Sequence, residues 1–177
     1  MRKNLVKAVS LLLLAVLAMS SALACSQDQY LPRNMKAAYT DADAFRFYIP
    51  EKWNLDEGQD SVSAYYSNSD PSSVSVLAWE LTHTDDTVDT WWETNEQDLK
   101  MVFSDYELIS QENTTVDGKY AKKYIYTATL GQTKFKFMQV AFVSSAVVYL
   151  FTYTSKEATF DSHIDDVNMM LEHWVLK

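Results

Sequence analysis

The chain has 177 residues, a formal net charge of −9, 47% hydrophobic residues and a single cysteine. This length is enough for one domain with a hydrophobic core. The acidic balance excludes nucleic acid and anionic lipid headgroups as partners, because binding to both relies on clustered Lys and Arg. One cysteine excludes an internal disulfide framework, so packing must hold the fold together.

The first 25 residues have the pattern of a bacterial lipoprotein signal. Three basic residues precede an apolar run over residues 9–19 and a small-residue cleavage site at residues 22–24. Cys25 follows directly, where lipoprotein processing attaches a diacylglycerol and then a palmitate to the new N-terminus. The sequence therefore predicts a signal peptide over residues 1–24, a lipid at Cys25, and anchoring to a bacterial membrane, facing outside the cytoplasm.

An alternative for Cys25 stays open. Residues 22–24 also form an A-x-A site for ordinary signal peptidase, which leaves an exported protein with a free thiol. An uncleaved anchor is disfavoured, since the apolar run is shorter than the ~20 residues that a span needs.

Residues 25–36 are polar and lack periodicity, so we interpret them as a lipidated tether and residues 37–177 as a single domain. The removed segment holds three of the 15 basic residues and none of the 24 acidic ones, so the mature chain has 12 against 24, a net charge of −12. Membrane attachment then depends on the acyl chains. Solubility alone can explain the acidity.

The domain begins with three predicted strands and a helix. Apolar residues alternate over residues 42–53, and further strands are predicted over residues 61–68 and 73–82. From Asp85 or Asp86, either of which can cap a helix, apolar residues recur every three to four positions. This spacing predicts a helix over about residues 87–104.

Four extended runs follow, over residues 106–113, 120–130, 133–143 and 146–154. Tight two-residue turns separate the last three and make neighbouring strands antiparallel. The last two runs are apolar on both faces, which predicts that the sheet is covered on both faces.

A final helix is predicted to supply part of that cover. Its apolar stripe contains Phe160, Ile164, Val167, Leu171 and Trp174, and the acidic residues 161, 165, 166 and 172 lie mostly opposite. The predicted fold class is α+β: an antiparallel sheet of six to seven strands flanked by two amphipathic helices.

Three segments together resemble the PsbP-like family, which includes bacterial DcrB-type lipoproteins. They are FRFYIPEKW at residues 45–53, YELISQENTTVDG at residues 106–118, and the closing strand and helix over residues 148–176. The resemblance implies an α/β/α sandwich and a non-enzymatic extracytoplasmic protein. It implies no role in photosynthesis.

Motifs for catalysis are missing from the sequence. There is no G-x-S-x-G nucleophile turn, the sole thiol lies at the lipid-bearing tip, and three scattered glycines cannot form a phosphate loop. An enzyme is therefore the least favoured of three hypotheses.

Metal binding has some support from individual residues. His83 lies close to Asp85 and Asp86 before the first helix, and His163 and Asp166 lie on the final helix. Imidazole and carboxylate ligands can hold a zinc or manganese ion. The alternative for these residues is a solvated helical face with ordinary acidic capping, in which case no cofactor is implied.

Two pairs of neighbouring aromatic residues suggest a binding patch. Trp91 and Trp92 lie about 100° apart on a helix, and Tyr65 and Tyr66 point to opposite faces of a strand. One exposed ring from each pair can form a patch for a peptide, glycan or lipid tail. The alternative is that all four rings belong to the core.

We therefore expect a non-enzymatic, lipid-anchored envelope protein that binds a protein or another envelope component. The alternative is an envelope protein that binds or delivers a metal.

Overall fold

The computed structural model describes residues 31–56, 62–83 and 85–177, which lie in one compact unit, Leu31–Lys177. The predicted signal peptide and Cys25 lie outside these residues. Within the described ranges, no helix is both long enough and apolar enough to cross a membrane.

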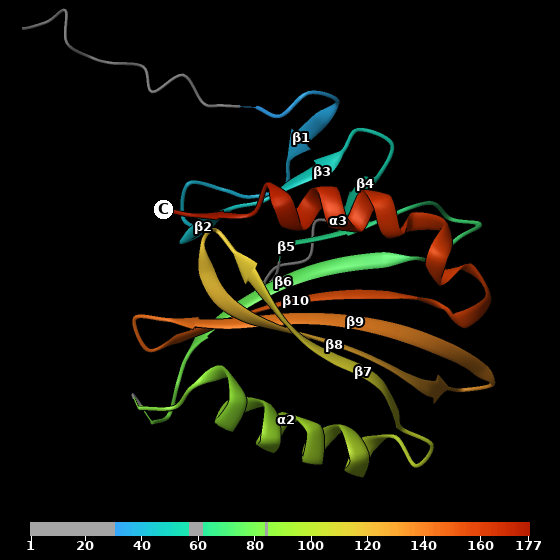
Figure 1. The fold of residues 1–177 in the computed structure, drawn as a ribbon. Helices are drawn as coiled ribbons and strands as arrows, with labels where there is room; N and C mark the ends of the chain where they lie inside the picture. Colours follow the sequence, from blue (N-terminus) through green and yellow to red (C-terminus); the bar gives the residue numbers. More distant parts are fainter. Residues whose placement is uncertain (1–30, 57–61, 84) are drawn as a thin grey trace, which may run out of the picture. The chain divides into compact units, whose positions relative to one another are not determined.

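A seven-stranded antiparallel sheet forms the centre of the unit, in the order β4-β5-β6-β10-β9-β8-β7 (Figure 1). Two short pairs lie beside it, β1 with β3 and β2 with β11. The strands are β1 Met35–Ala37, β2 Phe45–Arg46, β3 Tyr48–Pro50, β4 Asn54–Asp56, β5 Val62–Tyr65, β6 Ser73–Glu80, β7 Glu107–Val116, β8 Lys119–Leu130, β9 Thr133–Ser144, β10 Val147–Lys156 and β11 Val175–Leu176.

Three two-residue turns join β7 to β10, as the sequence predicts. Asp117 and Gly118 have φ of 49° and 70°, and Gly131 has φ of 64°. Both central residues of the third turn, Ser145 and Ala146, also have positive φ, at 54° and 60°. Positive φ at the first or both central residues gives the backbone twist that suits tight hairpins. The antiparallel order of these four strands is therefore confirmed.

Helix α2, Val88–Val102, matches the predicted first helix, but its N-cap differs from the prediction. Thr87 is the N-cap: its side chain accepts a hydrogen bond from the backbone of Thr90, and the Thr90 side chain accepts one from the backbone of Thr87. The predicted caps Asp85 and Asp86 lie just before it. A reciprocal pair satisfies two free N–H groups at once, whereas a single aspartate satisfies one.

The C-terminal helix differs more from its prediction. It begins as a 3-10 helix, η1 Glu157–His163, and continues as α3, Ile164–Glu172. Phe160 of the predicted stripe lies in η1 and is buried, but within α3 the buried side is rotated from the predicted one. Asp166 and Met170 are buried, whereas Ile164 and Leu171 are only half-buried.

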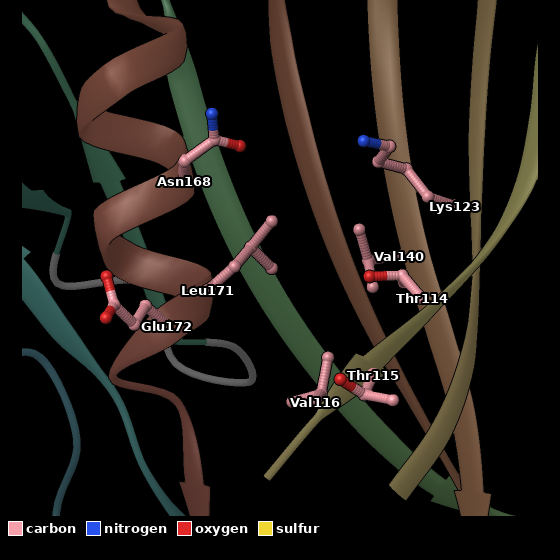
Figure 2. A pocket seen from close by; sticks show the side chains of 8 residues that line it. All are labelled: Thr114, Thr115, Val116, Lys123, Val140, Asn168, Leu171 and Glu172. Atoms are coloured by element: carbon pink, nitrogen blue, oxygen red, sulfur yellow. The ribbon is translucent and has the colours of Figure 1, made fainter. Parts of the chain in front are cut away.

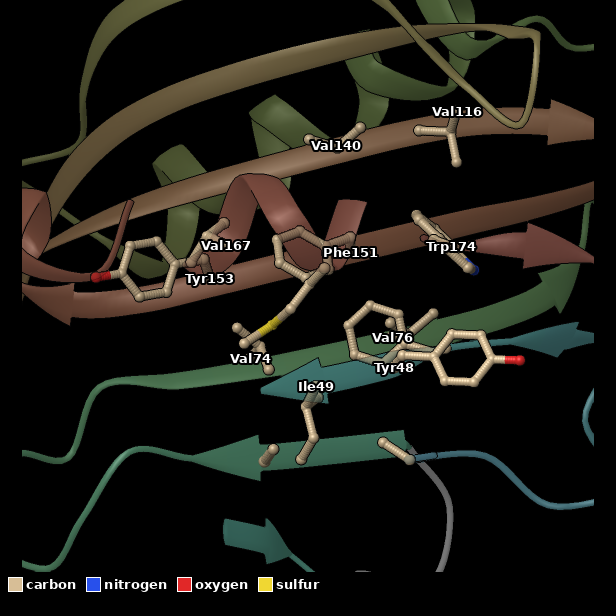
Figure 3. Packing of buried hydrophobic residues seen from close by; sticks show 14 of the residues in the cluster. Tyr48, Ile49, Val74, Val76, Val116, Val140, Phe151, Tyr153, Val167 and Trp174 are labelled. Carbon is tan, nitrogen blue, oxygen red and sulfur yellow. The ribbon is translucent and has the colours of Figure 1, made fainter. Parts of the chain in front are cut away.

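The two helices cover opposite faces of the sheet (Figure 1). The face with α3 carries the larger core, in which Trp174, Phe151, Tyr153 and Val167 pack against β6 and β9 (Figure 3). On the other face, Trp92 of α2 packs with Tyr124, Tyr126 and Phe137. The predicted α+β class and the cover on both faces are confirmed.

Two segment boundaries were predicted wrongly. Met35 and Lys36 belong to β1, although the sequence places them in the tether, because Met35 pairs with Pro50 and is buried. The predicted strand over residues 42–53 is split into β2 and β3 around Phe47, which is fully buried. The polarity of residues 25–36 does not reveal the pairing of Met35 with Pro50, because Pro50 lies fifteen positions further along the chain.

Candidate functional site

The predicted metal ligands fall into separate environments. His83 and Asp85 are exposed in the loop before α2, and Asp86 accepts a hydrogen bond from the Thr90 hydroxyl at 3.4 Å. In the described part of the chain, no three His, Cys, Asp or Glu side chains gather as a metal site would require. Zinc or manganese binding therefore stays a prediction.

His163 lies in a buried network instead of on a solvated face. Its Nε2 donates a hydrogen bond to Asp70 Oδ2 at 2.8 Å, since a carboxylate can only accept. The imidazole packs on the Tyr66 ring at 4.1 Å and on Trp53 at 5.7 Å. The half-buried Tyr66 is therefore part of this packing on the α3 side.

Asp166 is buried, and it was predicted to face solvent. Its Oδ2 accepts a hydrogen bond from Trp53 Nε1 at 2.9 Å and pairs with Lys52 Nζ at the same distance. Trp53 lies 113 positions away in the sequence, which is why the pattern could not reveal the contact. This carboxylate joins α3 to the segment between β3 and β4.

The Asp70–His163 pair lacks the geometry of an activated serine. The Ser72 hydroxyl is hydrogen-bonded to this pair, but its Oγ donates to Asp70 Oδ1 at 2.7 Å and not to the imidazole. Activation of a serine requires the histidine to lie between hydroxyl and carboxylate. Burial alone would raise the pKa of Asp70, but the hydrogen bonds from His163 and Ser72 outweigh it and hold that pKa below its usual value.

The predicted pair Trp91 and Trp92 divides between core and surface. Trp92 is buried and stacks on Tyr124, with ring centroids 3.4 Å apart and an angle of 6°. Trp91 is half-buried, and its ring contacts Trp79 of β6 at 5.8 Å. Tyr65 is also half-buried, on β5 opposite Ser73 of β6. Of the four predicted rings, Trp91 is the one that contacts an exposed aromatic ring, that of Trp79.

Leu77 and Trp79 are the surface residues that the sequence reading missed. They lie two positions apart on β6 and hence on one face, with 38% and 39% of each residue exposed. Helix α2 packs mainly on β8 and β9, so it leaves this part of β6 open. We call Leu77, Trp79 and Trp91 the tryptophan surface. The alternation along β6 already put Leu77 and Trp79 on one face.

The tryptophan surface borders an acidic segment. Residues 80–107 carry nine carboxylates and one lysine. Val102, eleven residues and about three turns after Trp91, lies on the same side of α2 and is 72% exposed. The half-buried Trp91 and the exposed Val102 therefore lie on one side of an acidic helix.

A separate pocket of about 200 Å³ lies on the opposite face, between α3 and the β7–β8 hairpin. Figure 2 shows Asn168, Leu171 and Glu172 of α3 on one side and Lys123 and the end of β7 on the other. The floor is apolar, with Val116 and Val140 buried beside Leu171. Lys123 forms an ion pair with Glu112. None of the three histidines lines this pocket.

No protein-family model matches this sequence, and no curated protein matches it either. Solved structures do match, and they share the fold. The cyanobacterial PsbP (CyanoP) of Synechocystis sp. PCC 6803 has a TM-score of 0.60 at 14% identity, over 88% of this chain and 99% of its own.

Two further structures extend the comparison. LpqN of Mycobacterium tuberculosis, described as involved in cell envelope biogenesis, has a TM-score of 0.60 at 14% identity, over 81% of this chain and 90% of its own. The Ran-binding protein Mog1p of Saccharomyces cerevisiae has a TM-score of 0.58 at 9% identity, over 81% of this chain and 95% of its own. The chain therefore has a PsbP/Mog1-like fold.

Proposed function

We propose that this chain is a lipid-anchored cell-envelope protein whose folded unit is a non-enzymatic binding module. The module binds a protein or another envelope component through the tryptophan surface, and Cys25 carries the lipid that holds it outside the cytoplasm. Nucleic acid is not a partner of a chain with this acidic balance.

The observation that carries the proposal is the exposure of Leu77 and Trp79 beside Trp91 on an uncovered part of the sheet. Aromatic residues are enriched in the centres of interfaces, where a few of them supply most of the binding energy. The carboxylates of residues 80–107 form a polar rim and would steer a basic partner toward this face.

The chemistry of the pocket supports the non-enzymatic part of the proposal. Its cation, Lys123, is already paired with Glu112, and it has no histidine that could act as a base. His163 is committed to Asp70, and His173 Nδ1 contacts the Met169 carbonyl oxygen. Two structural neighbours also point to binding or envelope roles, since Mog1p is described as Ran-binding and LpqN as involved in envelope biogenesis.

A double substitution tests the surface. The full chain with Leu77→Ser and Trp79→Ser should lose the partner that chemical crosslinking of intact cells recovers with the unchanged chain. Tyr120→Ser, which alters another exposed aromatic residue, is the control and should retain the partner. Equal recovery by all three chains would contradict the proposal.

A separate experiment tests the anchor. The mature protein should begin at Cys25, carry the mass of a diacylglycerol and an N-linked acyl chain, and enter the detergent phase of a phase partition. Cys25→Ser should leave the protein unprocessed and without lipid. An unmodified cysteine in the aqueous phase would show that the free-thiol alternative is correct.

A further inference from the structure

Strand β7 forms one edge of the sheet, and within the described residues β8 is its strand neighbour on one side only. The register is shifted by a bulge between Leu108 and Ser110, but residues 111–116 pair with β8 without interruption. One row of backbone N–H and C=O groups along this second half of β7 has no strand partner.

Proteins usually protect such an edge. Prolines, lysines and bulges on the edge strand prevent another chain from pairing with it. In β7 the bulge protects the first half. The second half has neither proline nor lysine, and its one charged side chain, Glu112, is paired with Lys123 of β8. The second half of the strand, over residues 111–116, therefore remains able to accept a partner strand.

Helix α3 lies beside this unprotected half of β7. The pocket of about 200 Å³ contacts Thr114, Thr115 and Val116 in succession, and Leu171 faces them from α3 (Figure 2). Successive side chains point to opposite faces of a strand. A cavity that contacts all three residues therefore borders the backbone of β7 as well as one face.

From this geometry we infer that an extended polypeptide segment binds between β7 and α3 as an additional strand. The free backbone groups of β7 would pair with it, which is the established mode of strand addition at a sheet edge. The buried Val116 of β7 and the half-buried Leu171 of α3 would receive one apolar side chain. The volume is below the ~300–1,000 Å³ of pockets that enclose whole small molecules, which favours one side chain of a longer ligand.

The charges around the pocket indicate which peptides can bind there. Glu172 at the pocket is exposed and forms no ion pair within the described residues, and Lys123 is already neutralised by Glu112. A net charge of −12 on the mature chain repels acidic segments. The ligand class is therefore an extended peptide with an apolar residue close to a lysine or arginine.

This site between β7 and α3, which we call the groove, is distinct from the tryptophan surface, since the two lie on opposite faces of the sheet. The inference adds a second site to the proposed binding module, and each site can fail without the other. The variants below keep the two outcomes apart.

The test uses the full chain, purified in detergent, and a library of random 12-residue peptides displayed on phage. We expect enrichment of peptides that combine an apolar residue with a neighbouring lysine or arginine. Synthetic copies should bind at least tenfold more weakly to Asn168→Arg, which fills the groove, and to Glu172→Lys. Both positions are exposed, so these variants should fold, which their melting temperatures would show. The Leu77→Ser, Trp79→Ser chain should bind the peptides unchanged.

N-methylation of each peptide nitrogen in turn tests the strand geometry. Pairing with one edge uses every second N–H group, so methylation should abolish binding at alternate positions and leave it intact between them. Four results would overturn the inference: no enriched peptide, binding unaffected by either groove variant, a methylation pattern without a period of two, or a β7 edge occupied by a second copy of the chain.

Discussion

Asp70 joins the turn between β5 and β6 to the C-terminal η1 helix. Its carboxylate accepts hydrogen bonds from His163 Nε2 and from the backbone and hydroxyl of Ser72. Tyr66 covers the imidazole, so the network is shielded from water on that side. The role that follows from these contacts is to hold the two segments together.

A substitution at Asp70 should make the free energy of unfolding less dependent on pH. The pKa of Asp70 in the folded state lies below its ordinary value of 3.8, so the stabilisation is present above that value and is lost as the pH falls through the folded-state pKa. Asp70→Asn should cost about 2 kcal/mol at pH 7, the value of a hydrogen bond to a charged group, and much less at pH 3. Urea unfolding at both pH values measures the difference.

Asp161→Asn is the matched control for that measurement. The Asp161 side chain is 88% exposed and lies 3.8 Å from Lys136, so the substitution should change stability little at either pH. If Asp70→Asn gave the same loss at pH 3 as at pH 7, the charged form of Asp70 would not be what the network stabilises.

Ala146 adopts a backbone conformation that a residue with a Cβ rarely takes. Its φ of 60° lies in the left-handed region, which costs about 1–2 kcal/mol for residues other than glycine. Ala146→Gly should therefore raise the free energy of unfolding by about 1 kcal/mol, after allowing for the greater entropy of glycine in the unfolded chain. Ala78→Gly, in β6, should lower it by roughly 0.5–1 kcal/mol. Equal effects of the two substitutions would rule out strain in the turn.

At the scale of elements, α3 is held in place by a buried carboxylate as well as by apolar contacts. Asp166 accepts from the Trp53 indole and pairs with Lys52, both on the chain between β3 and β4. Val167 and Met170 beside it are fully buried. Neighbouring residues of α3 therefore supply a polar contact to this segment and apolar side chains to the core.

Removal of that carboxylate should destabilise the fold. Asp166→Ala leaves the Trp53 N–H group without its acceptor in a buried site, and the expected cost is about 3 kcal/mol. Asp165→Ala alters the exposed neighbouring residue and should cost less than about 0.5 kcal/mol. Urea unfolding distinguishes them, and similar values for both would mean that Asp166 is not part of the packing that holds α3.

How well each element could be predicted depends on how local its determinants are. Strands β8 to β10 were placed to within two residues, because long apolar runs and two-residue turns define them. The α2 boundaries also followed from local spacing. The burial of Asp166 could not be predicted from local spacing, because its partner Trp53 is distant in sequence.

The candidate surface was harder to predict for a related reason. Whether Trp79 is exposed depends on how much of the sheet α2 covers, and spacing within β6 says nothing about that. The spacing of Trp91 and Trp92 predicts that they can face different environments, because neighbouring helical positions differ by about 100°, but it does not say which of the two is buried. The position of the groove between β7 and α3 depends on how α3 lies on the sheet, which local sequence patterns do not show.

For the whole molecule, the two helices cover the sheet unequally. One face is closed by α3 together with the β1–β3 pair, and the other is covered by α2 mainly over β8 and β9. The open part of the second face carries the tryptophan surface, bordered by carboxylates on α2. Association with a basic partner at this face should weaken as salt is raised, because screening reduces steering between exposed charges.

Photo-crosslinking in intact cells tests whether the tryptophan surface binds a partner. A photoreactive phenylalanine analogue replaces Trp79 in the full chain, and the same analogue at Leu130, another exposed apolar position, is the control. We expect one discrete adduct from position 79, with the linked residues of the partner confined to one patch, and no such adduct from position 130. No adduct at position 79, or the same pattern from both positions, would contradict it.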